Sequence, residues 1–179
     1  MSKENRVRLF KRSKPTVRSL EILDGEGYSR DVGVMWAAYK AGSFTNMPPD
    51  ITQEQFLLFV ENMQKRFNKV WLVDDRNKAF PSSGSGPVML VGTNTNGLTI
   101  TAEGMGFKWA KRANILRSVA AFLNMIRYSK KTGVCFVRGK RDVLPLLHGL
   151  KKYDVLYYVG RVSVDEWLFA IRGRGSEGN

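Results

Sequence analysis

Cysteine and histidine are almost absent from this sequence, which contains one of each among 179 residues. Cys135, the only cysteine, has no partner for a disulfide within the chain. Its neighbours in GVCFV are typical of a buried strand, where a free cysteine acts as a small apolar side chain. With His148 as the only histidine, no cluster of cysteine and histidine is available to hold zinc. We therefore expect no structural metal and no catalytic thiol.

Long apolar segments are also missing. No uninterrupted apolar run approaches the roughly 20 residues that a membrane-spanning helix needs. The basic N-terminus, MSKENRVRLFKRSK, lacks the apolar centre of a secretion signal. We expect a soluble protein that is made in a cytoplasm and has no membrane segment.

Acidic residues are scarce. The chain contains 16 Asp and Glu residues and 29 Lys and Arg residues, which gives a net charge of +13. Such an excess attracts polyanions by salt-sensitive steering and says little about the fold. Two interpretations stay open. The charge belongs either to a solvated surface with no specific target or to a surface that meets a polyanion such as DNA.

Apolar residues are well represented, at 43% of the chain, and aromatic residues make up 11%. This composition excludes a wholly disordered chain, and the length is that of one domain with a substantial core. We expect a single domain over residues 1–179. Its ordered core should run from about residue 6 to residue 172, and the polar tail at 173–179 should fray.

Extended patterns, turn signals and helical spacings alternate along the chain. The clearest element is a helix that begins at a capping box formed by Thr52 and Gln55. The expected order is β-α-α-β-β-β-α-β-α-β-β. A three-stranded meander followed by a strand–helix–strand crossover predicts a mixed α/β fold. Its central sheet, of about seven mostly antiparallel strands, should carry helices on both faces. The expected strands lie at 6–10 or 15–23, 69–75, 87–92, 98–103, 134–139, 154–160 and 166–171, and the expected helices at 31–44, 52–67, 110–130 and 143–150.

A cluster of cations marks the start of the long helix, directly after the strand at 98–103. The unpaired N–H groups and the dipole at a helix start favour a negative charge there. We expect an anion, a nucleic-acid backbone among the candidates, to meet this segment. The residues expected to contact it are Lys108, Trp109, Lys111, Arg112 and Arg117.

The order of elements resembles the fold of the GNAT N-acetyltransferases from about residue 6 to residue 172. In this family the strand before the central helix binds pantetheine through its backbone, and a Gln/Arg-x-x-Gly-x-Gly/Ala loop at the helix start holds the pyrophosphate of acetyl-CoA. The resemblance assigns the pyrophosphate position to Lys111, Arg112, Ala113, Asn114 and Arg117. Aligned on residues 112–117, the loop has Ile115 and Arg117 where the family has glycine and glycine or alanine. The motif is therefore degenerate, because only glycine lets the backbone approach phosphate without an intervening Cβ.

Three residues are candidates for catalysis if the resemblance extends to activity. Glu103, at the end of the strand at 98–103, corresponds to the general bases of the family, and burial would have to raise its affinity for a proton. The family's acid, a tyrosine near the last helix, corresponds to His148. Tyr153, at the position where the family has phenylalanine, is the other candidate for this role. The alternative is structural: a solvent-facing strand end for Glu103, and side chains without a chemical role for the other two.

Three functions remain open at this stage. The first is a non-catalytic GNAT-like protein without a cofactor that binds DNA or other virion proteins, resembling the internal virion proteins of tailed bacteriophages in outline. Such a protein would be made in a bacterial host and assemble into an oligomer or particle. The second is an active N-acyltransferase that uses acetyl-CoA. The third is a free nucleic-acid binder, in which tryptophans stack on bases. We expect Trp36, Trp71 and Trp167 to pack in the core or at its rim instead, which leaves Trp109.

Overall fold

The computed structural model of the chain describes residues 14–76, 86–97, 99–129, 134–140, 157–164 and 166–172. The segments expected at 6–10, 143–150 and 173–179 lie outside these ranges. The described strands are β1 (Thr16–Ser19), β2 (Leu23–Asp24), β3 (Gly27–Tyr28), β4 (Lys69–Asp75), β5 (Gly86–Asn96), β6 (Thr99–Gly106), β7 (Val134–Lys140), β8 (Tyr157–Ser163) and β9 (Glu166–Arg172). The described helices are α2 (Arg30–Lys40), α3 (Gln53–Arg66) and α4 (Arg112–Ser129).

The central sheet has the strand order β1-β4-β5-β6, and each neighbouring pair is antiparallel. Strands β5 and β6 form a long hairpin whose register runs from Met89 opposite Gly106 to Asn96 opposite Thr99. The turn follows at Gly97, where φ is +57°. The left-handed backbone needs little energy at glycine, so the Asn-Gly pair sets this turn as expected.

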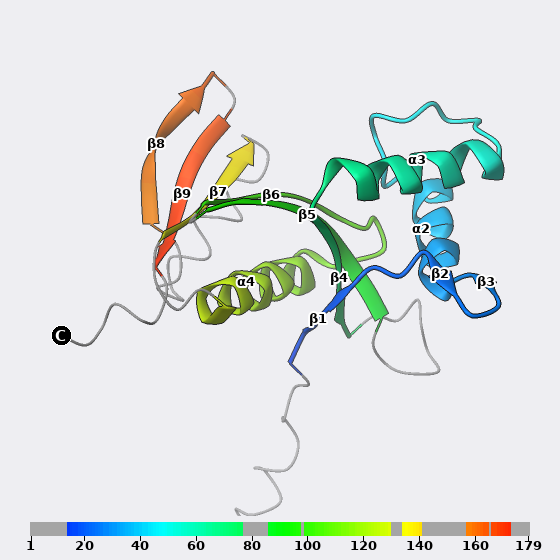
Figure 1. Cartoon of the computed structure of the whole chain (residues 1–179), viewed down its shortest axis with the longest axis horizontal. Helices are drawn as coiled ribbons and strands as arrows, with labels where there is room; N and C mark the ends of the chain where they lie inside the picture. Colours follow the sequence, from blue (N-terminus) through cyan, green and yellow to red (C-terminus); the bar gives the residue numbers. More distant parts are fainter. Residues whose placement is uncertain are drawn as a thin grey trace, which may run out of the picture.

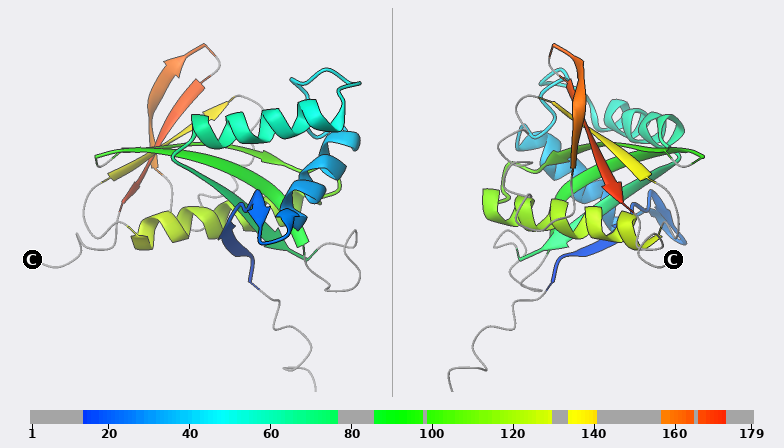
Figure 2. Two further views of the ribbon diagram at one scale, coloured as in Figure 1. Left: turned by 45° about the vertical axis from the view of Figure 1, so that its right-hand side comes forward. Right: turned by 90° about the vertical axis from the view of Figure 1, so that its left-hand side faces the viewer.

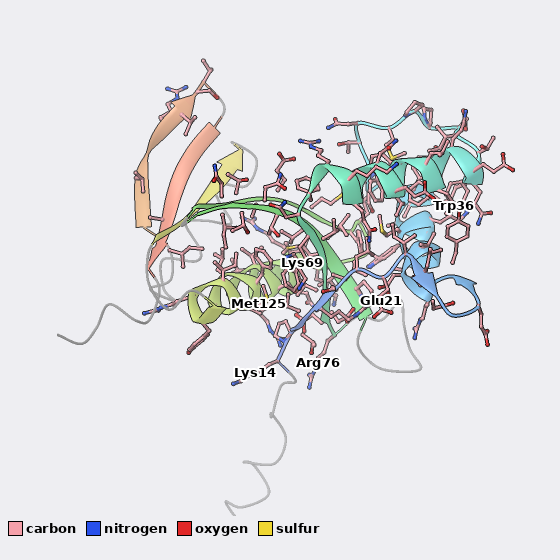
Figure 3. The ribbon with its side chains drawn as sticks, in the orientation of Figure 1. Lys14, Glu21, Trp36, Lys69, Arg76 and Met125 are labelled. Carbon is pink, nitrogen blue, oxygen red and sulfur yellow. The ribbon has the colours of Figure 1, made fainter. Side chains whose placement is uncertain are left out.

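Both faces of the central sheet are buried. Helix α4 covers one face, and α2 and α3 lie on the other (Figure 1). Alternate residues of a strand point to opposite faces. Accordingly, Val73 and Val91 belong to the core beneath α4, while Leu72 and Leu90 belong to the core beneath α2 and α3. Side chains crowd the space on both sides (Figure 3). The predicted mixed α/β fold, with a mostly antiparallel sheet and helices on both faces, is confirmed.

A second sheet has the strand order β7-β9-β8, also with antiparallel pairs. It turns away from the central sheet, as the two views of Figure 2 show. Strands β6 and β7 lie next to each other, yet no ladder joins them among the described residues. Strand β8 continues to Ser163, which pairs with Glu166, so part of the link expected after residue 160 is strand instead.

Short-range signals in the sequence set the ends of the first two helices. Thr52 Oγ1 accepts a hydrogen bond from the Gln55 amide (3.2 Å), and Gln55 Oε1 accepts one from the Thr52 amide (2.9 Å). The predicted capping box is therefore confirmed at the start of α3. Helix α2 begins after Ser29, whose side chain accepts from the Asp31 amide, and ends before Gly42, whose φ of +73° favours glycine.

The segment at residues 24–31, expected to be a turn, contains two short strands. Leu23 pairs with Tyr28 and Asp24 with Gly27, which makes β2 and β3 a small antiparallel ribbon. Turn residues are compatible with such a tight hairpin, and two residues per strand are too few to show an alternating apolar pattern. The order of elements therefore gains two strands before α2.

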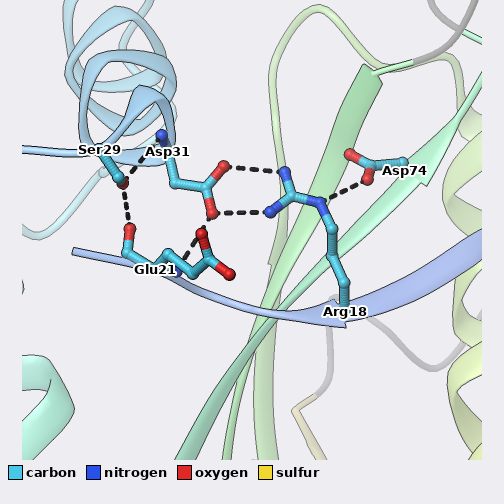
Figure 4. A network of polar contacts seen from close by, with 5 residues as sticks. All are labelled: Arg18, Glu21, Ser29, Asp31 and Asp74. Carbon is cyan, nitrogen blue, oxygen red and sulfur yellow. Dashed lines mark hydrogen bonds and ion pairs between the residues drawn. The ribbon is translucent and has the colours of Figure 1, made fainter. Parts of the chain in front are cut away.

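A partly buried ion-pair network joins β1, α2 and β4 (Figure 4). The guanidinium of Arg18 donates to both carboxylate oxygens of Asp31 (2.7 and 2.8 Å) and to Asp74 Oδ2 (2.7 Å). Asp31 also accepts from the Glu21 amide, and the Ser29 hydroxyl donates to the Glu21 carbonyl oxygen. The hydrogen bond to Asp31, followed by that to Asp74, raises the pKa of Arg18 above its ordinary value, against the opposite effect of burial. The network thus ties the start of α2 to strands β1 and β4 of the central sheet.

Candidate functional site

Strand β6 is longer than the sequence predicts and places Glu103 in its middle. The ladder with β5 continues for three residues past Glu103, to Gly106. The expectation that Glu103 ends the strand is therefore wrong, because Gly104 and Gly106 belong to the strand. A Cβ on Gly106 would lie 2.5 Å from Ile115 Cδ1, so this glycine lets α4 pack closely on β6.

Glu103 is exposed and forms an ion pair. Each of its carboxylate oxygens lies 3.0 Å from Nη2 of Arg66, the last residue of α3. The Glu103 side chain is 60% exposed and the Arg66 side chain 66% exposed. The burial that the sequence argument required of a base at Glu103 is absent. A carboxylate in this place can still bind an approaching ammonium group, because an exposed ion pair with Arg66 is weak.

A cavity of about 430 Å³ opens beside Glu103. Its walls come from α3, from strands β5 and β6, and from residues 43–47 after α2. The Phe67 ring forms part of the wall next to Gly92, where a Cβ would lie 2.5 Å from the ring. Glycine at position 92 therefore allows the ring to lie against the sheet. The volume falls within the usual range of small-molecule sites, about 300–1,000 Å³.

The start of α4 lies directly beyond β6 (Figure 1). The Asn114 and Ile115 amides both donate to the Lys111 carbonyl oxygen. No described residue accepts a hydrogen bond from the Arg112 or Ala113 amide, and the first turn contains no acidic residue. Two donors at this helix start are therefore available to an anion.

The four cations predicted around this helix start differ in what surrounds them. The Lys108 amide donates to Ser43 Oγ (3.0 Å), and its ammonium group lies beside Gly42, just after the end of α2. Arg117 Nη2 lies 3.4 Å from Oδ1 of the buried Asp75. By contrast, Lys111 and Arg112 are exposed and form no ion pair within the described part of the chain. These two cations therefore best suit an anion at α4.

Asn114 and Trp109 are engaged by the protein itself. The Asn114 amide group donates to the Arg76 carbonyl oxygen, which ties the first turn of α4 to the end of β4. Trp109 Nε1 donates to the Pro87 carbonyl oxygen (2.9 Å), and its ring centroid lies 5.0 Å from that of Phe107. Packing and the hydrogen bond hold this indole against the sheet, so its role as a platform for bases stays a prediction.

Two of the other tryptophans pack as expected. Trp36 stacks on Tyr39 with ring centroids 5.2 Å apart, and Trp71 donates from Nε1 to Thr93 Oγ1 (3.0 Å) beneath α4. The side chain of Trp167 lies outside the described residues, as do His148 and Tyr153 in full. The proposed roles of His148 and Tyr153 stay predictions.

Sequence reasoning missed Arg66, Phe67 and Asp75. Arg66, the last residue of α3, lies 37 residues before Glu103 in the sequence, and Phe67 follows it directly. No local pattern indicates that these residues lie near Glu103. Asp75 looks like any residue at the end of a strand, yet it is the buried partner of Arg117. A signal existed only for Asp75, since a carboxylate at the end of an apolar strand needs a partner when it is buried.

Neither metal ligands nor a membrane span can be identified in the described ranges. No group of three or more His, Cys, Asp or Glu side chains there is arranged to hold a metal ion. Among the same residues, no helix combines the length and the apolar character that crossing a membrane requires.

Solved structures of GNAT acetyltransferases superpose on most of the chain. A probable GNAT-family acetyltransferase from Chromobacterium violaceum is 11% identical with a TM-score of 0.61, and the match covers 93% of this chain and 91% of that chain. A GNAT-family acetyltransferase from Bacillus anthracis is 14% identical with a TM-score of 0.58, covering 90% and 96%. This chain has the GNAT fold. RimL, a ribosomal-protein alpha-N-acetyltransferase in complex with coenzyme A, is 10% identical with a TM-score of 0.59, covering 92% and 97%.

The similarity to these GNAT proteins is one of fold. No family model matches the sequence, and no curated protein matches it. Strand β6 and helix α4 occupy the positions of the strand and the central helix that hold acetyl-CoA in the family described above. Both the cavity beside Glu103 and the open start of α4 therefore adjoin the same strand.

Proposed function

We propose that this chain binds an acyl-CoA and transfers the acyl group to an amine. One observation carries the proposal: a single strand, β6, borders a cavity that contains a carboxylate and leads directly to a helix start where two amides have no hydrogen-bond acceptor among the described residues. The first feature suits an acceptor amine, and the second suits the pyrophosphate of coenzyme A. The GNAT fold supports the proposal, although a fold alone does not establish chemistry.

The residues at the start of α4 fit the pyrophosphate group. Because α4 begins at Arg112, a phosphate loop at the helix start must lie about one turn earlier than residues 112–117. Residues 108–113 then read Lys-x-x-Lys-x-Ala, so that Ala113 occupies the final glycine or alanine position. Lys111 replaces the first glycine. We assign the pyrophosphate to the Arg112 and Ala113 amides, with charge from Lys111 and Arg112.

The remaining cofactor contact belongs to the backbone of β6. Strand β6 pairs with β5 on one edge, and among the described residues no strand pairs with its other edge, which faces β7. Unpaired backbone groups on a strand edge can bind an extended amide chain. Pantetheine is such a chain, and this edge is where the family resemblance expects it.

Glu103 supplies the chemistry that the chain itself can perform. When an amine fills the cavity and displaces Arg66, the ligand shields the Glu103 carboxylate from water and so supplies the burial that is absent in the free chain. The carboxylate then accepts a proton from the acceptor ammonium, which leaves a neutral and nucleophilic nitrogen. When bound, the acyl-CoA supplies a thioester whose C–S bond breaks as the new C–N bond forms. Tyr153 and His148 remain the candidates for the group that returns a proton to the departing sulfur.

Removing the two cations at α4 tests the proposal. The double variant Lys111→Ala and Arg112→Ala should raise the Kd for acetyl-CoA by roughly 10-fold to 100-fold, since each charged contact is worth about 1.5 kcal/mol or less at an exposed site. Isothermal titration calorimetry measures the change. The double variant Lys14→Ala and Arg30→Ala removes the same charge elsewhere and should bind like the wild type. Equal affinities for the two double variants would contradict the assignment.

A second candidate is a non-catalytic protein that binds DNA, for which the net charge of +13 is the supporting observation. The comparisons give no support for a virion protein. If the start of α4 binds a DNA backbone, the Lys111→Ala and Arg112→Ala double variant should reduce the slope of log K against log salt by up to about 2. An unchanged slope would remove α4 from DNA binding.

A further inference from the structure

We infer that the cavity beside β6 binds a small primary alkylamine that carries one ammonium group and an aromatic or other apolar group. This inference rests on the proposed acyltransferase function and names the class of its acceptor. It follows from three properties of the cavity: the chemistry of its walls, the number of its charges, and the weakness of the ion pair at its opening.

Six of the fifteen residues that line the cavity have aromatic or thioether side chains, and apolar atoms make up most of its wall. Phenyl rings offer faces and edges on which an aromatic ligand packs favourably. Methionine side chains are flexible and polarisable, so they adapt to apolar ligands of different shape. Such walls favour a ligand that is mostly apolar. The residues concerned are Phe44, Met47, Phe59, Met63, Phe67 and Met105.

Charged groups are few in the cavity. Among the described residues that line it, Glu103 is the only acid and Arg66 the only base. A polyamine carries several positive charges and needs several carboxylates, whereas this wall offers one. A nucleotide-linked sugar needs cations for its phosphates, and the single arginine is paired with Glu103. The charges therefore suit a ligand with one ammonium group.

Arg66 can leave Glu103 when an ammonium group arrives. Both side chains are more than half exposed. An exposed ion pair changes the equilibrium constant between its paired and separated states by a factor of about five at most. Arg66 also lies over the Phe67 ring, with its guanidinium carbon 5.2 Å from the ring centroid, so the arginine keeps a partner after the exchange. The acceptor nitrogen then occupies the place of the guanidinium, beside the carboxylate that takes its proton.

Binding of three probes in the absence of coenzyme A tests the inference. We expect 2-phenylethylamine to bind at least about 10-fold more tightly than 2-phenylethanol, which lacks the charge, and than spermidine, which lacks the apolar group. A charge-assisted hydrogen bond to Glu103 accounts for the first difference, and the apolar wall accounts for the second. Ligand-observed NMR measures all three affinities.

Two variants separate the contributions of charge and wall. Glu103→Gln should lower the affinity for 2-phenylethylamine about 10-fold and leave the affinity for 2-phenylethanol unchanged. Glu61→Gln, which removes the same charge from α3 outside the cavity lining, should bind like the wild type. Met63→Gln should lower the affinity for both aromatic probes, because it makes the cavity wall more polar while the side-chain volume stays nearly constant.

The outcomes distinguish this inference from the proposed function. Spermidine binding as tightly as 2-phenylethylamine, or no measurable binding of 2-phenylethylamine, would overturn the inference even if acetyl-CoA binds. Titration with acetyl-CoA alone decides the proposed function separately. If acetyl-CoA fails to bind while the aromatic amine binds as expected, the cavity remains an amine site and the acyltransferase proposal is wrong.

Discussion

Replacement of Glu103 by glutamine is expected to lower kcat for acyl transfer to an amine by roughly 100-fold to 10,000-fold, the usual contribution of general base catalysis. Glutamine preserves the size of the side chain and loses its capacity to accept a proton, so the acceptor nitrogen stays protonated. The affinity for acetyl-CoA should not change, because the pyrophosphate is assigned to α4. Release of free thiol with 2-phenylethylamine as acceptor measures kcat.

The Glu61→Gln variant is the matched control, since its carboxylate lies on α3 outside the cavity lining. Its kcat should equal that of the wild type within about twofold, as expected for a surface substitution. If Glu103→Gln also keeps kcat within that range while it binds acetyl-CoA normally, Glu103 is not the base. Proton removal would then have to come from another residue.

Replacement of Arg18 by methionine is expected to lower the free energy of unfolding by about 2–4 kcal/mol. The variant leaves the buried Asp31 carboxylate without its two charged hydrogen bonds and removes a bond to Asp74. Removing one partner of a buried ion pair costs about 3–5 kcal/mol, and the partial exposure of Arg18 reduces that value. Urea denaturation measures the change through a shift of the midpoint at constant m.

The control for Arg18 is Arg66→Met, which breaks an ion pair whose two side chains are both exposed. Its expected cost is below about 1 kcal/mol, because exposed ion pairs contribute little to stability. The comparison isolates burial, since residue type and substitution are the same. Equal destabilisation by the two variants would mean that the network shown in Figure 4 contributes no more than a surface pair.

Local signals predicted much of the fold. The capping box at Thr52 and Gln55 and the Asn-Gly turn before β6 act within a few residues, and both are confirmed. The order of elements predicted helices on both faces of the sheet. The continuous apolar runs of β4 and β5 agree with this, because they place apolar side chains on both faces. The two short strands near residues 23–28 escaped prediction because strands of two residues carry no periodic pattern.

The candidate site was only partly predictable, because its contacts join distant segments. The sequence indicated an anion site at the start of α4, and this helix does begin within the cationic cluster, at Arg112. It could not show that Asp75 engages Arg117. Nor could it show that Arg66 pairs with Glu103 at the edge of a cavity. Each of these contacts depends on how α3, α4 and the sheet pack together.

Titration of the wild-type chain with acetyl-CoA most directly tests whether this GNAT fold binds an acyl-CoA at the start of α4. We predict saturable binding of one molecule per chain at about 150 mM salt. At a concentration near 100 times Kd, acetyl-CoA should raise Tm by about 5–10 °C, because such binding contributes roughly 2.7 kcal/mol to stability. No heat of binding and an unchanged Tm at millimolar acetyl-CoA would contradict the proposal. That result would favour the second candidate function, a non-catalytic protein that binds DNA.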